Sequence, residues 1–152
     1  MTGFTTQRLI LEPLNRNHAD AFYEGLKDGR LYEYIDESPP SSLAALRQRY
    51  TKLESRLKET RAYAGYVQAT ILRNSIAMIA YVLFAESWGN GYAREATGAM
   101  LEQLKRVHGV TVATAAVDRR NERSRQLLRF MGFVEAKCHA QIAGDVQFEK
   151  IL

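Results

Sequence analysis

Several residue types are scarce in this sequence, and their scarcity limits what the protein can be. Cys138 is the single cysteine, so an intrachain disulfide is excluded and a reducing cytosol is the expected compartment. It is a weak candidate nucleophile, because only the adjacent His139 is a nearby histidine partner. The longest apolar run, Ile76–Phe84, is far shorter than the roughly 18 residues of a membrane span. Because Met1–Thr6 also lacks a signal-peptide pattern, we expect a cytoplasmic protein with no membrane partner.

Neither charge sign is strongly in excess. The 152 residues are 46% hydrophobic and 25% charged, with no internal repeat, which indicates one globular domain over residues 1–152. The formal net charge of +4 favours an anionic partner only weakly. A polyphosphate cofactor and nucleic acid are both compatible with that charge, and no metal site is expected.

Hydrophobic periodicity predicts interspersed strands and helices. Strands are expected at Thr6–Leu14, Ala62–Leu72, Ile76–Phe84, Val110–Val117, Phe133–Gln141 and Val146–Leu152. Helices are expected at Ala19–Leu26, Leu43–Leu57, Ala93–Val107 and Asn121–Gly132. The strand Ile76–Phe84 is apolar on both faces and should therefore be central. This order predicts an α/β (α+β) fold, in which a mixed, mostly antiparallel sheet of about six strands is flanked by about four helices.

A glycine-containing loop joins the predicted central strand to the next helix. Gly89 and Gly91 allow a positive φ and a close approach of the backbone. The following helix start offers unpaired N–H groups and the positive end of a dipole. Together these features favour a cradle for an anion, most naturally a pyrophosphate, although an ordinary glycine turn would look the same. The segment matches neither the P-loop nor the G-x-G-x-x-G dinucleotide pattern.

A second polar group follows the next predicted strand. Asn121 ends that strand and begins a helix, so its side chain can both cap the helix and face the neighbouring strand, unless it is a simple N-cap. Ser124 lies one turn into the helix and is either a surface hydroxyl or a functional one. The most basic part of the chain surrounds them, with Arg119, Arg120, Arg123, Arg125 and Arg129.

Two blocks of this sequence resemble a known enzyme family. Residues Tyr81–Ala96 are similar to the acetyl-CoA signature of the GNAT acetyltransferases, especially the branch of ribosomal-protein-alanine N-acetyltransferases. Residues Asn121–Ser124 followed by Gly132-Phe133 resemble the second block of that branch. The opening Thr6–Leu11 is similar to its first strand, and the resemblance covers about half of the chain. It implies a GNAT-like acyl-CoA N-acyltransferase fold.

The resemblance implies a role for each matching residue. Main-chain groups of Leu83 and Phe84 would pair with the pantetheine arm of acetyl-CoA, and Asn121 would contact its amide region. Ser124 would lie near the thioester sulfur as the candidate catalytic acid. The charge of Arg129 suggests a contact with the adenosine phosphate. The pyrophosphate would be held by backbone N–H groups of Trp88, Gly89, Asn90, Gly91, Tyr92 and Ala93.

Three departures from the family pattern bear on catalysis. Glu86 stands where relatives commonly have Gln or Arg, which a backbone cradle should tolerate, and it is also a candidate catalytic base. Leu128 stands seven residues after Asn121, where many relatives carry a tyrosine general acid. Either Ser124 replaces that tyrosine, or the thiolate leaves unaided, since thiols have a pKa near 8.5. Only Ala62–Leu72 is found where relatives have two strands, so either Lys58–Arg61 forms a stub of the other N-terminal strand or the first edge of the sheet is reduced.

The leading hypothesis is an N-acetyltransferase that uses acetyl-CoA and an unidentified primary amine, from a protein N-terminus or a small molecule. Further candidate bases are the loop carboxylates Glu33, Asp36 and Glu37. A non-catalytic acyl-CoA-binding or sensing domain is the alternative, favoured by Leu128. A nucleic-acid-binding module is disfavoured, because the arginine-rich segment lacks interleaved aromatic residues. A reduced sheet edge would favour pairing with a second chain as a homodimer.

Overall fold

The computed structural model describes residues 3–14, 18–35, 37–47, 53–57, 62–72, 75–136 and 144–152. The strands are β1 (Phe4–Thr5), β2 (Leu9–Pro13), β3 (Leu53–Leu57), β4 (Tyr63–Ile71), β5 (Ile76–Leu83), β6 (Val112–Asp118), β7 (Val134–Glu135) and β8 (Asp145–Ile151). The helices are α1 (Ala19–Leu26), α2 (Leu43–Arg47), α3 (Tyr92–His108) and α4 (Glu122–Phe130), with the 3-10 turns η2 (Gly29–Tyr32) and η4 (Ala85–Ser87). Within the described residues, no helix combines the length and apolarity needed to cross a bilayer.

The strands form one mixed sheet, as expected. Hydrogen bonds link the described strands in the order β1-β2-β3-β4-β5-β6-β8-β7. Strands β5 and β6 pair in parallel, with Ile76 opposite Val112, whereas β2–β3, β3–β4, β6–β8 and β7–β8 are antiparallel. The predicted fold class, a mostly antiparallel sheet flanked by helices, is therefore confirmed.

One expectation about the sheet is wrong. The helix predicted over Leu43–Leu57 ends at Arg47, and Leu53–Leu57 forms β3, which pairs with both β2 and β4. The leucines at 53 and 57 fit a helical spacing as well as a strand alternation, and pairing with two neighbours decides between them. The strand that the sequence appeared to lack is thus present, and the argument for a homodimer from a reduced edge loses its basis.

Contacts divide the chain into two compact units, which are described separately. Unit 1 comprises Met1–Gln68 and Tyr81–Thr97, and unit 2 comprises Ala69–Ala80 and Gly98–Leu152. The chain passes between the units within β4, β5 and α3.

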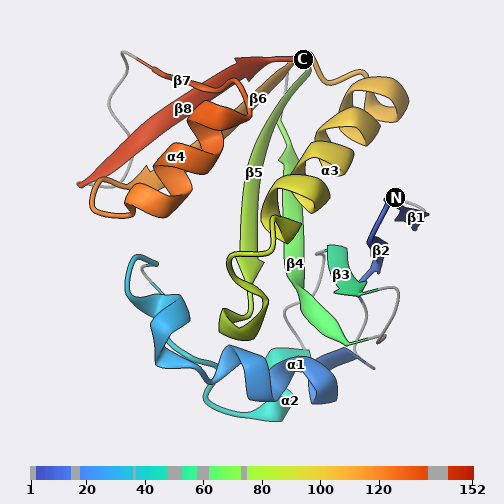
Figure 1. Ribbon diagram of the computed structural model, residues 1–152, viewed down its shortest axis with the longest axis vertical. Helices are drawn as coiled ribbons and strands as arrows, with labels where there is room; N and C mark the ends of the chain where they lie inside the picture. Colours follow the sequence, from blue (N-terminus) through green and yellow to red (C-terminus); the bar gives the residue numbers. More distant parts are fainter. Residues whose placement is uncertain are drawn as a thin grey trace. The chain divides into compact units, whose positions relative to one another are not determined.

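An aromatic core holds unit 1 together. The ring of Phe22 on α1 makes edge-on contacts with the rings of Phe84 and Tyr63, with centroids 5.3 and 5.1 Å apart. Such pairs add roughly 0.5–1.5 kcal/mol to the stabilisation from burial. Helices α1 and α2 lie side by side beneath this core (Figure 1). Trp88 packs against the same cluster, so the loop after β5 is anchored to the core.

In unit 2, helix α4 covers strands β6 and β8 (Figure 1). Leu128 of α4 is fully buried, as is Phe148 of β8, and Phe133 after the helix is 2% exposed. Strand β6 pairs along its whole length with β8, from Val112 opposite Ile151 to Asp118 opposite Asp145. The strand predicted over Phe133–Gln141 is described only as β7, since residues 137–143 lie outside the described part of the chain.

Candidate functional site

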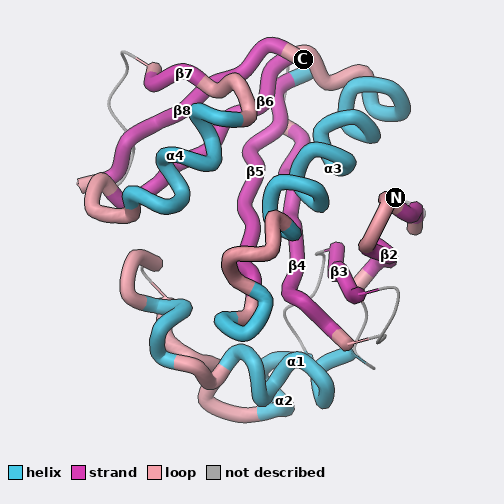
Figure 2. Tube along the Cα trace, viewed as in Figure 1, coloured by secondary structure: helices cyan, strands magenta, loops and turns pink. Residues whose placement is uncertain are grey.

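The loop predicted as an anion cradle links β5 to α3 in unit 1. After β5 the chain makes the 3-10 turn η4, passes through a short irregular segment and enters α3 at Tyr92 (Figure 2). Gly89 and Gly91 have φ angles of 78° and 77°, which side chains other than glycine rarely adopt. The glycine pair is therefore required by the backbone itself, as the sequence predicted.

Five backbone N–H groups of this loop have no acceptor within the described part of the chain. Among the described residues, no acceptor engages the backbone N–H of Gly89, Asn90, Gly91, Tyr92 or Ala93. The Glu95 N–H donates to the Gly91 carbonyl oxygen over 3.1 Å and begins the helical ladder. Gly89, Asn90 and Gly91 are exposed to solvent. Five unengaged amides at the positive end of a 17-residue helix suit an anion with several oxygens.

Not every predicted contact group is available. The Trp88 N–H, expected to face the phosphates, donates instead to the Ala85 carbonyl oxygen at 3.2 Å, because it closes the η4 turn. The Phe84 N–H donates to Ala64 of β4 at 2.8 Å, and the Phe84 carbonyl accepts from Ser87. The Leu83 carbonyl oxygen accepts the indole N–H of Trp88 at 2.7 Å. The cradle is therefore narrower than the sequence indicated and begins at Gly89.

A group that the sequence did not reveal supports the loop from outside. Arg8 donates through Nε to Glu95 Oε2 at 2.7 Å and through Nη1 to the Asn90 carbonyl oxygen at 2.8 Å. Its guanidinium also lies over the Tyr92 ring, 4.9 Å from the centroid. Thr6 donates through its hydroxyl to Glu95 Oε1. We call Thr6, Arg8 and Glu95 the brace.

Glu95 is a carboxylate under opposing influences. Its burial would raise its pKa, but hydrogen bonds from the Thr6 hydroxyl and from the backbone and guanidinium of Arg8 outweigh burial and lower the pKa below the usual value. The side chain is 15% exposed, against 46% for that of Arg8. Glu95 therefore stays ionised near neutral pH and keeps its attraction for Arg8.

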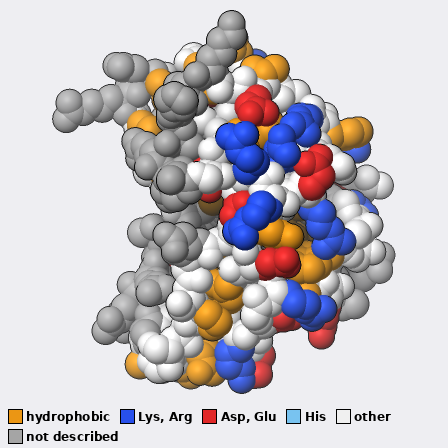
Figure 3. Space-filling view, turned by 90° about the vertical axis from the view of Figure 1, so that its left-hand side faces the viewer, with side chains coloured by type: hydrophobic (Ala, Val, Ile, Leu, Met, Phe, Trp, Pro, Cys, Tyr) orange, Lys and Arg blue, Asp and Glu red, His pale blue; other side chains and the backbone are white. Residues whose placement is uncertain are grey.

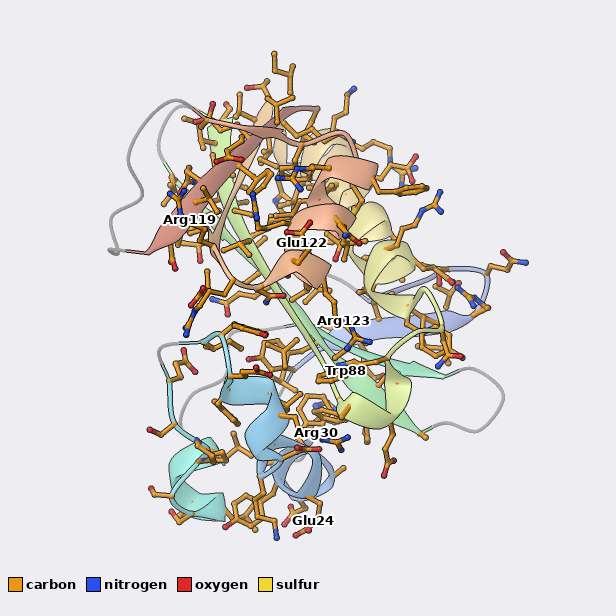
Figure 4. All side chains as sticks on the ribbon, turned by 60° about the vertical axis from the view of Figure 1, so that its left-hand side comes forward. Glu24, Arg30, Trp88, Arg119, Glu122 and Arg123 are labelled. Atoms are coloured by element: carbon orange, nitrogen blue, oxygen red, sulfur yellow. The ribbon has the colours of Figure 1, made fainter. Side chains whose placement is uncertain are left out.

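A second arginine lies beside the loop. The Arg30 guanidinium is 6.0 Å from the centre of the Trp88 ring, and Figure 4 shows the two side chains next to each other. Arg30 forms an ion pair with Asp28 at 2.6 Å and lowers the pKa of that carboxyl. Glu86, the candidate base, is exposed on η4. Of the other candidate bases, Glu33 and Glu37 are also exposed, whereas Asp36 lies outside the described residues.

The second predicted block forms the start of α4 in unit 2. Asn121 is the N-cap, and its Oδ1 accepts the Ser124 N–H at 3.1 Å. Asn121 therefore caps the helix, and its side-chain amide nitrogen is left for another contact. Ser124 is partly buried in the first turn. Leu128, at the position of the tyrosine acid in many relatives, is fully buried in the core, so nothing polar replaces that tyrosine there.

The basic segment of unit 2 is largely paired with acids. Arg129 lies 3.4 Å from Glu122 and 3.8 Å from Glu135, and Arg125 contacts the same two carboxylates. Figure 3 shows basic side chains beside acidic ones on the face that carries α4, rather than a uniformly basic area. To contact a phosphate, Arg129 would therefore have to give up its ion pairs with Glu122 and Glu135. The pairing of these arginines with acids also argues against a nucleic-acid-binding surface.

Comparison with known proteins shows where these features belong. A family model described as an acetyltransferase (GNAT) domain matches residues 8–134, from the arginine of the brace to β7. The chain belongs to the GNAT acetyltransferase family. Membership supports acetyl transfer as its general chemistry. A comparison with curated proteins found no match.

Solved structures share the GNAT fold at low identity. A GNAT-family acetyltransferase from Bacillus anthracis is 16% identical, with a TM-score of 0.86 over 99% of this chain and 98% of its own. The ribosomal-protein-S5-alanine acetyltransferase from Vibrio fischeri is 20% identical, with a TM-score of 0.82 over 99% and 97%. An acetyltransferase from Agrobacterium tumefaciens is 16% identical, with a TM-score of 0.84 over 100% and 95%. At these identities the likeness shows the fold.

The GNAT chain thus carries its candidate residues in two groups. Unit 1 holds Leu83, Phe84 and the loop from Trp88 to Ala93, together with the brace. Unit 2 holds Asn121, Ser124 and Arg129 on α4. Sequence reasoning found the local features of both groups and missed Arg8 and Glu95, because single charged residues on a strand and a helix give no local signal.

Proposed function

We propose that this GNAT protein is an N-acetyltransferase that moves the acetyl group of acetyl-CoA to a primary amine by direct attack in a ternary complex. The observation that carries the proposal is the set of five unengaged backbone N–H groups, from Gly89 to Ala93, at the start of α3. Family membership supports the pyrophosphate of acetyl-CoA as the anion in that cradle. The acceptor is a protein N-terminus or a small molecule.

The residues present fit the coenzyme. Five unengaged N–H groups suit the oxygens of a pyrophosphate, and a Cβ on Gly91 would lie 3.4 Å from Arg8 Nη2. The family pattern assigns Leu83 of unit 1, and Asn121 and Ser124 of unit 2, to the pantetheine arm, although the Leu83 carbonyl oxygen already accepts the Trp88 indole N–H. Arg129 would bind the adenosine phosphate by exchanging Glu122 or Glu135 for it. These assignments come from the family pattern together with the local geometry.

Catalysis in this proposal depends on few groups. Acetyl-CoA supplies an activated acyl thioester. Ser124 would donate a hydrogen bond to the departing thiolate, which takes its proton from solvent; because a thiol has a pKa of about 8.5, this step helps but is not indispensable. Glu86, or a water that it polarises, accepts the proton of the amine. A backbone N–H near Leu83 stabilises the oxyanion, and holding both substrates together supplies the proximity.

The acceptor belongs to the finer part of the proposal. The names of two structural neighbours, the ribosomal-protein-S5-alanine acetyltransferase from V. fischeri and a candidate ribosomal-protein-serine acetyltransferase from V. cholerae, favour a protein N-terminus. Peptides that begin with alanine or serine are therefore the first acceptors to test. We also propose that residues 1–152 act as one domain, since the family model extends across both units. The single cysteine suits a reducing compartment, so we place the protein in the cytoplasm.

A non-catalytic acyl-CoA-binding domain is the second candidate. Two observations favour it: Leu128 is fully buried where many relatives place a tyrosine acid, and the candidate base Glu86 is exposed. In this case the cradle would bind the coenzyme without using it.

Calorimetric titration with acetyl-CoA, followed by a thiol-release assay with N-terminal peptides and small amines, separates these candidates. Binding with turnover on an amine supports the transferase, and binding without turnover on any amine supports the sensing domain. Absence of binding would contradict both. In an active enzyme, Ser124→Ala should lower kcat more than it weakens acetyl-CoA binding. Equal losses in both would assign Ser124 to binding alone.

A further inference from the structure

The brace holds one particular peptide group of the loop. Arg8 Nη1 donates to the Asn90 carbonyl oxygen over 2.8 Å. No cis peptide bond occurs among the described residues, so the Asn90–Gly91 peptide is trans. In a trans peptide the C=O and N–H bonds point in opposite directions. Fixing the Asn90 carbonyl toward Arg8 therefore turns the Gly91 N–H away from Arg8, toward the open side of the loop.

Groups on either side of this peptide are also held. The Asn90 side chain donates to the Trp88 carbonyl oxygen at 3.1 Å, and the Gly91 carbonyl accepts the Glu95 N–H. Because Gly91 has a φ of 77° and no Cβ, its peptide plane would otherwise rotate easily. The hydrogen bond from Arg8 therefore restricts the rotation of the Asn90–Gly91 peptide plane that glycine would otherwise allow.

From this geometry we propose that Arg8 is a positioning residue for the coenzyme, which orients the Asn90–Gly91 peptide so that the Gly91 N–H meets the pyrophosphate. The inference rests on the proposed function of the cradle. Arg8 acts through the loop backbone and needs no contact with the ligand. It is therefore distinct from a basic side chain that binds a phosphate directly.

Glu95 aims Arg8 at this carbonyl. It accepts three hydrogen bonds, from the Thr6 hydroxyl, from the Arg8 backbone N–H at 2.7 Å and from Arg8 Nε at 2.7 Å. The guanidinium group of Arg8 is planar and rigid. Because Glu95 holds its Nε, the Nη1 of the same group is directed at the Asn90 carbonyl oxygen. A lysine has one compact ammonium and cannot hold both acceptors in this fixed geometry. The variant Arg8→Lys therefore keeps the positive charge but loses the orientation of the Asn90–Gly91 peptide.

The test uses calorimetric titration of the full chain with coenzyme A. We expect Arg8→Gln and Arg8→Lys to raise the Kd by about tenfold each, as the loss of a charge-assisted hydrogen bond of roughly 1.5 kcal/mol implies. Glu95→Gln should raise the Kd by a similar factor. In the double variant with Arg8→Gln, the loss of binding free energy should be smaller than the sum of the losses in the two single variants. Arg106→Gln, at an exposed position near the end of α3, is the matched control and should leave the Kd unchanged.

Two further readouts separate positioning from a purely structural role. Trp88 is the only tryptophan, so its fluorescence reports on the loop, and the change in emission on adding coenzyme A should shrink in the Arg8 variants. Dephospho-coenzyme A lacks the 3′-phosphate but keeps the pyrophosphate. Its affinity should therefore fall, from wild type to each Arg8 variant, by the same factor as the affinity of coenzyme A.

Each outcome decides a different point. If the wild-type chain does not bind coenzyme A, the proposed function fails, and the inference fails with it. If the wild type binds and Arg8→Lys binds equally well, Arg8 contributes charge only and the positioning role is wrong. A loss seen with coenzyme A but not with dephospho-coenzyme A would place Arg8 on the 3′-phosphate, which also overturns it. If Arg8→Gln does not fold by circular dichroism, Arg8→Lys and Glu95→Gln carry the test.

Discussion

The α-carbon of Gly65 in β4 lies directly against the carbonyl group of Val82 in β5. A Cβ added to Gly65 would lie 2.1 Å from the Val82 carbonyl oxygen and 2.8 Å from the Leu83 α-carbon. Both are main-chain atoms, which cannot move aside as the end of a side chain would. The φ of Gly65 is 143°, which other residues rarely adopt. Glycine at 65 thus permits the close approach of β4 to the residues that lead into the loop between β5 and α3.

Replacing Gly65 by alanine should destabilise the fold severely. We expect Gly65→Ala to lower the free energy of unfolding by about 3 kcal/mol or more, because an overpacked site and a strained backbone add together. Gly98→Ala in α3 is the matched control: its Cβ meets nothing within 4 Å, so it should gain roughly 1 kcal/mol from helix propensity. Urea unfolding followed by circular dichroism measures both, and equal stabilities for the two variants would show that β4 and β5 can separate here.

The cradle makes its own prediction about ligand binding. Gly91→Trp should abolish binding of acetyl-CoA, because a Cβ there would lie 3.4 Å from Arg8 Nη2, so the indole would push the guanidinium off the Asn90 carbonyl oxygen and displace the loop amides. Gly109 follows α3, also has a left-handed φ, of 64°, and has nothing within 4 Å of an added Cβ. Gly109→Trp therefore carries a similar backbone cost away from the loop and should bind acetyl-CoA normally. Calorimetric titration compares them, and full affinity in Gly91→Trp would remove the pyrophosphate from this loop.

Thr97 of α3 offers a test of buried polarity. Its side chain is fully buried, and Oγ1 has no hydrogen-bond partner among the described residues. Thr97→Val should raise the free energy of unfolding by about 1 kcal/mol, because an unsatisfied buried hydroxyl costs roughly 1–3 kcal/mol. Thr97→Ser keeps the hydroxyl and loses a methyl group, so it should lower stability by about 1 kcal/mol. Urea unfolding monitored by Trp88 fluorescence distinguishes them; a less stable valine variant would reveal a partner for the hydroxyl.

Local chemistry explains which elements the sequence predicted. Helix α4 begins where Asn121 can cap it, and the loop before α3 needs glycine at 89 and 91 because of positive φ angles. These are properties of a few adjacent residues. Strand β3 was missed because Leu53–Leu57 fits both helical and strand periods, and only its pairing with β2 and β4 settles the choice.

The site divides in the same way. The open amides from Gly89 to Ala93 follow from a glycine loop at a helix start, which sequence reasoning can find. The engagement of the Trp88 N–H depends on the η4 turn, which the sequence did not indicate. The contact between Arg8 and Glu95 joins residues 87 positions apart, and each alone resembles an ordinary solvated charge. Only the folded chain brings them together.

The acid sensitivity of the fold should depend in part on Asp118. The pKa of this carboxyl falls to about 2, chiefly because the Arg120 side chain donates to it and secondly because the Arg120 backbone N–H does so. In the unfolded chain an aspartate has a pKa of about 3.9. Because the folded pKa is the lower one, ionised Asp118 stabilises the fold fully above about pH 4. This stabilisation is lost as the pH falls through about 2.

Asp118→Asn removes this source of pH dependence. The variant should be less stable than wild type at pH 6 and should lose less of its thermal stability between pH 5 and pH 2.5, because it has no carboxylate to protonate. Arg120→Gln keeps the Asp118 carboxylate but removes its guanidinium partner, while the backbone N–H of residue 120 remains. The stability of this variant should therefore depend less on pH than that of wild type, but more than that of Asp118→Asn. Thermal unfolding by circular dichroism across this range measures all three proteins. If Asp118→Asn loses as much stability on acidification as wild type does, the ion pair with Arg120 does not hold in solution.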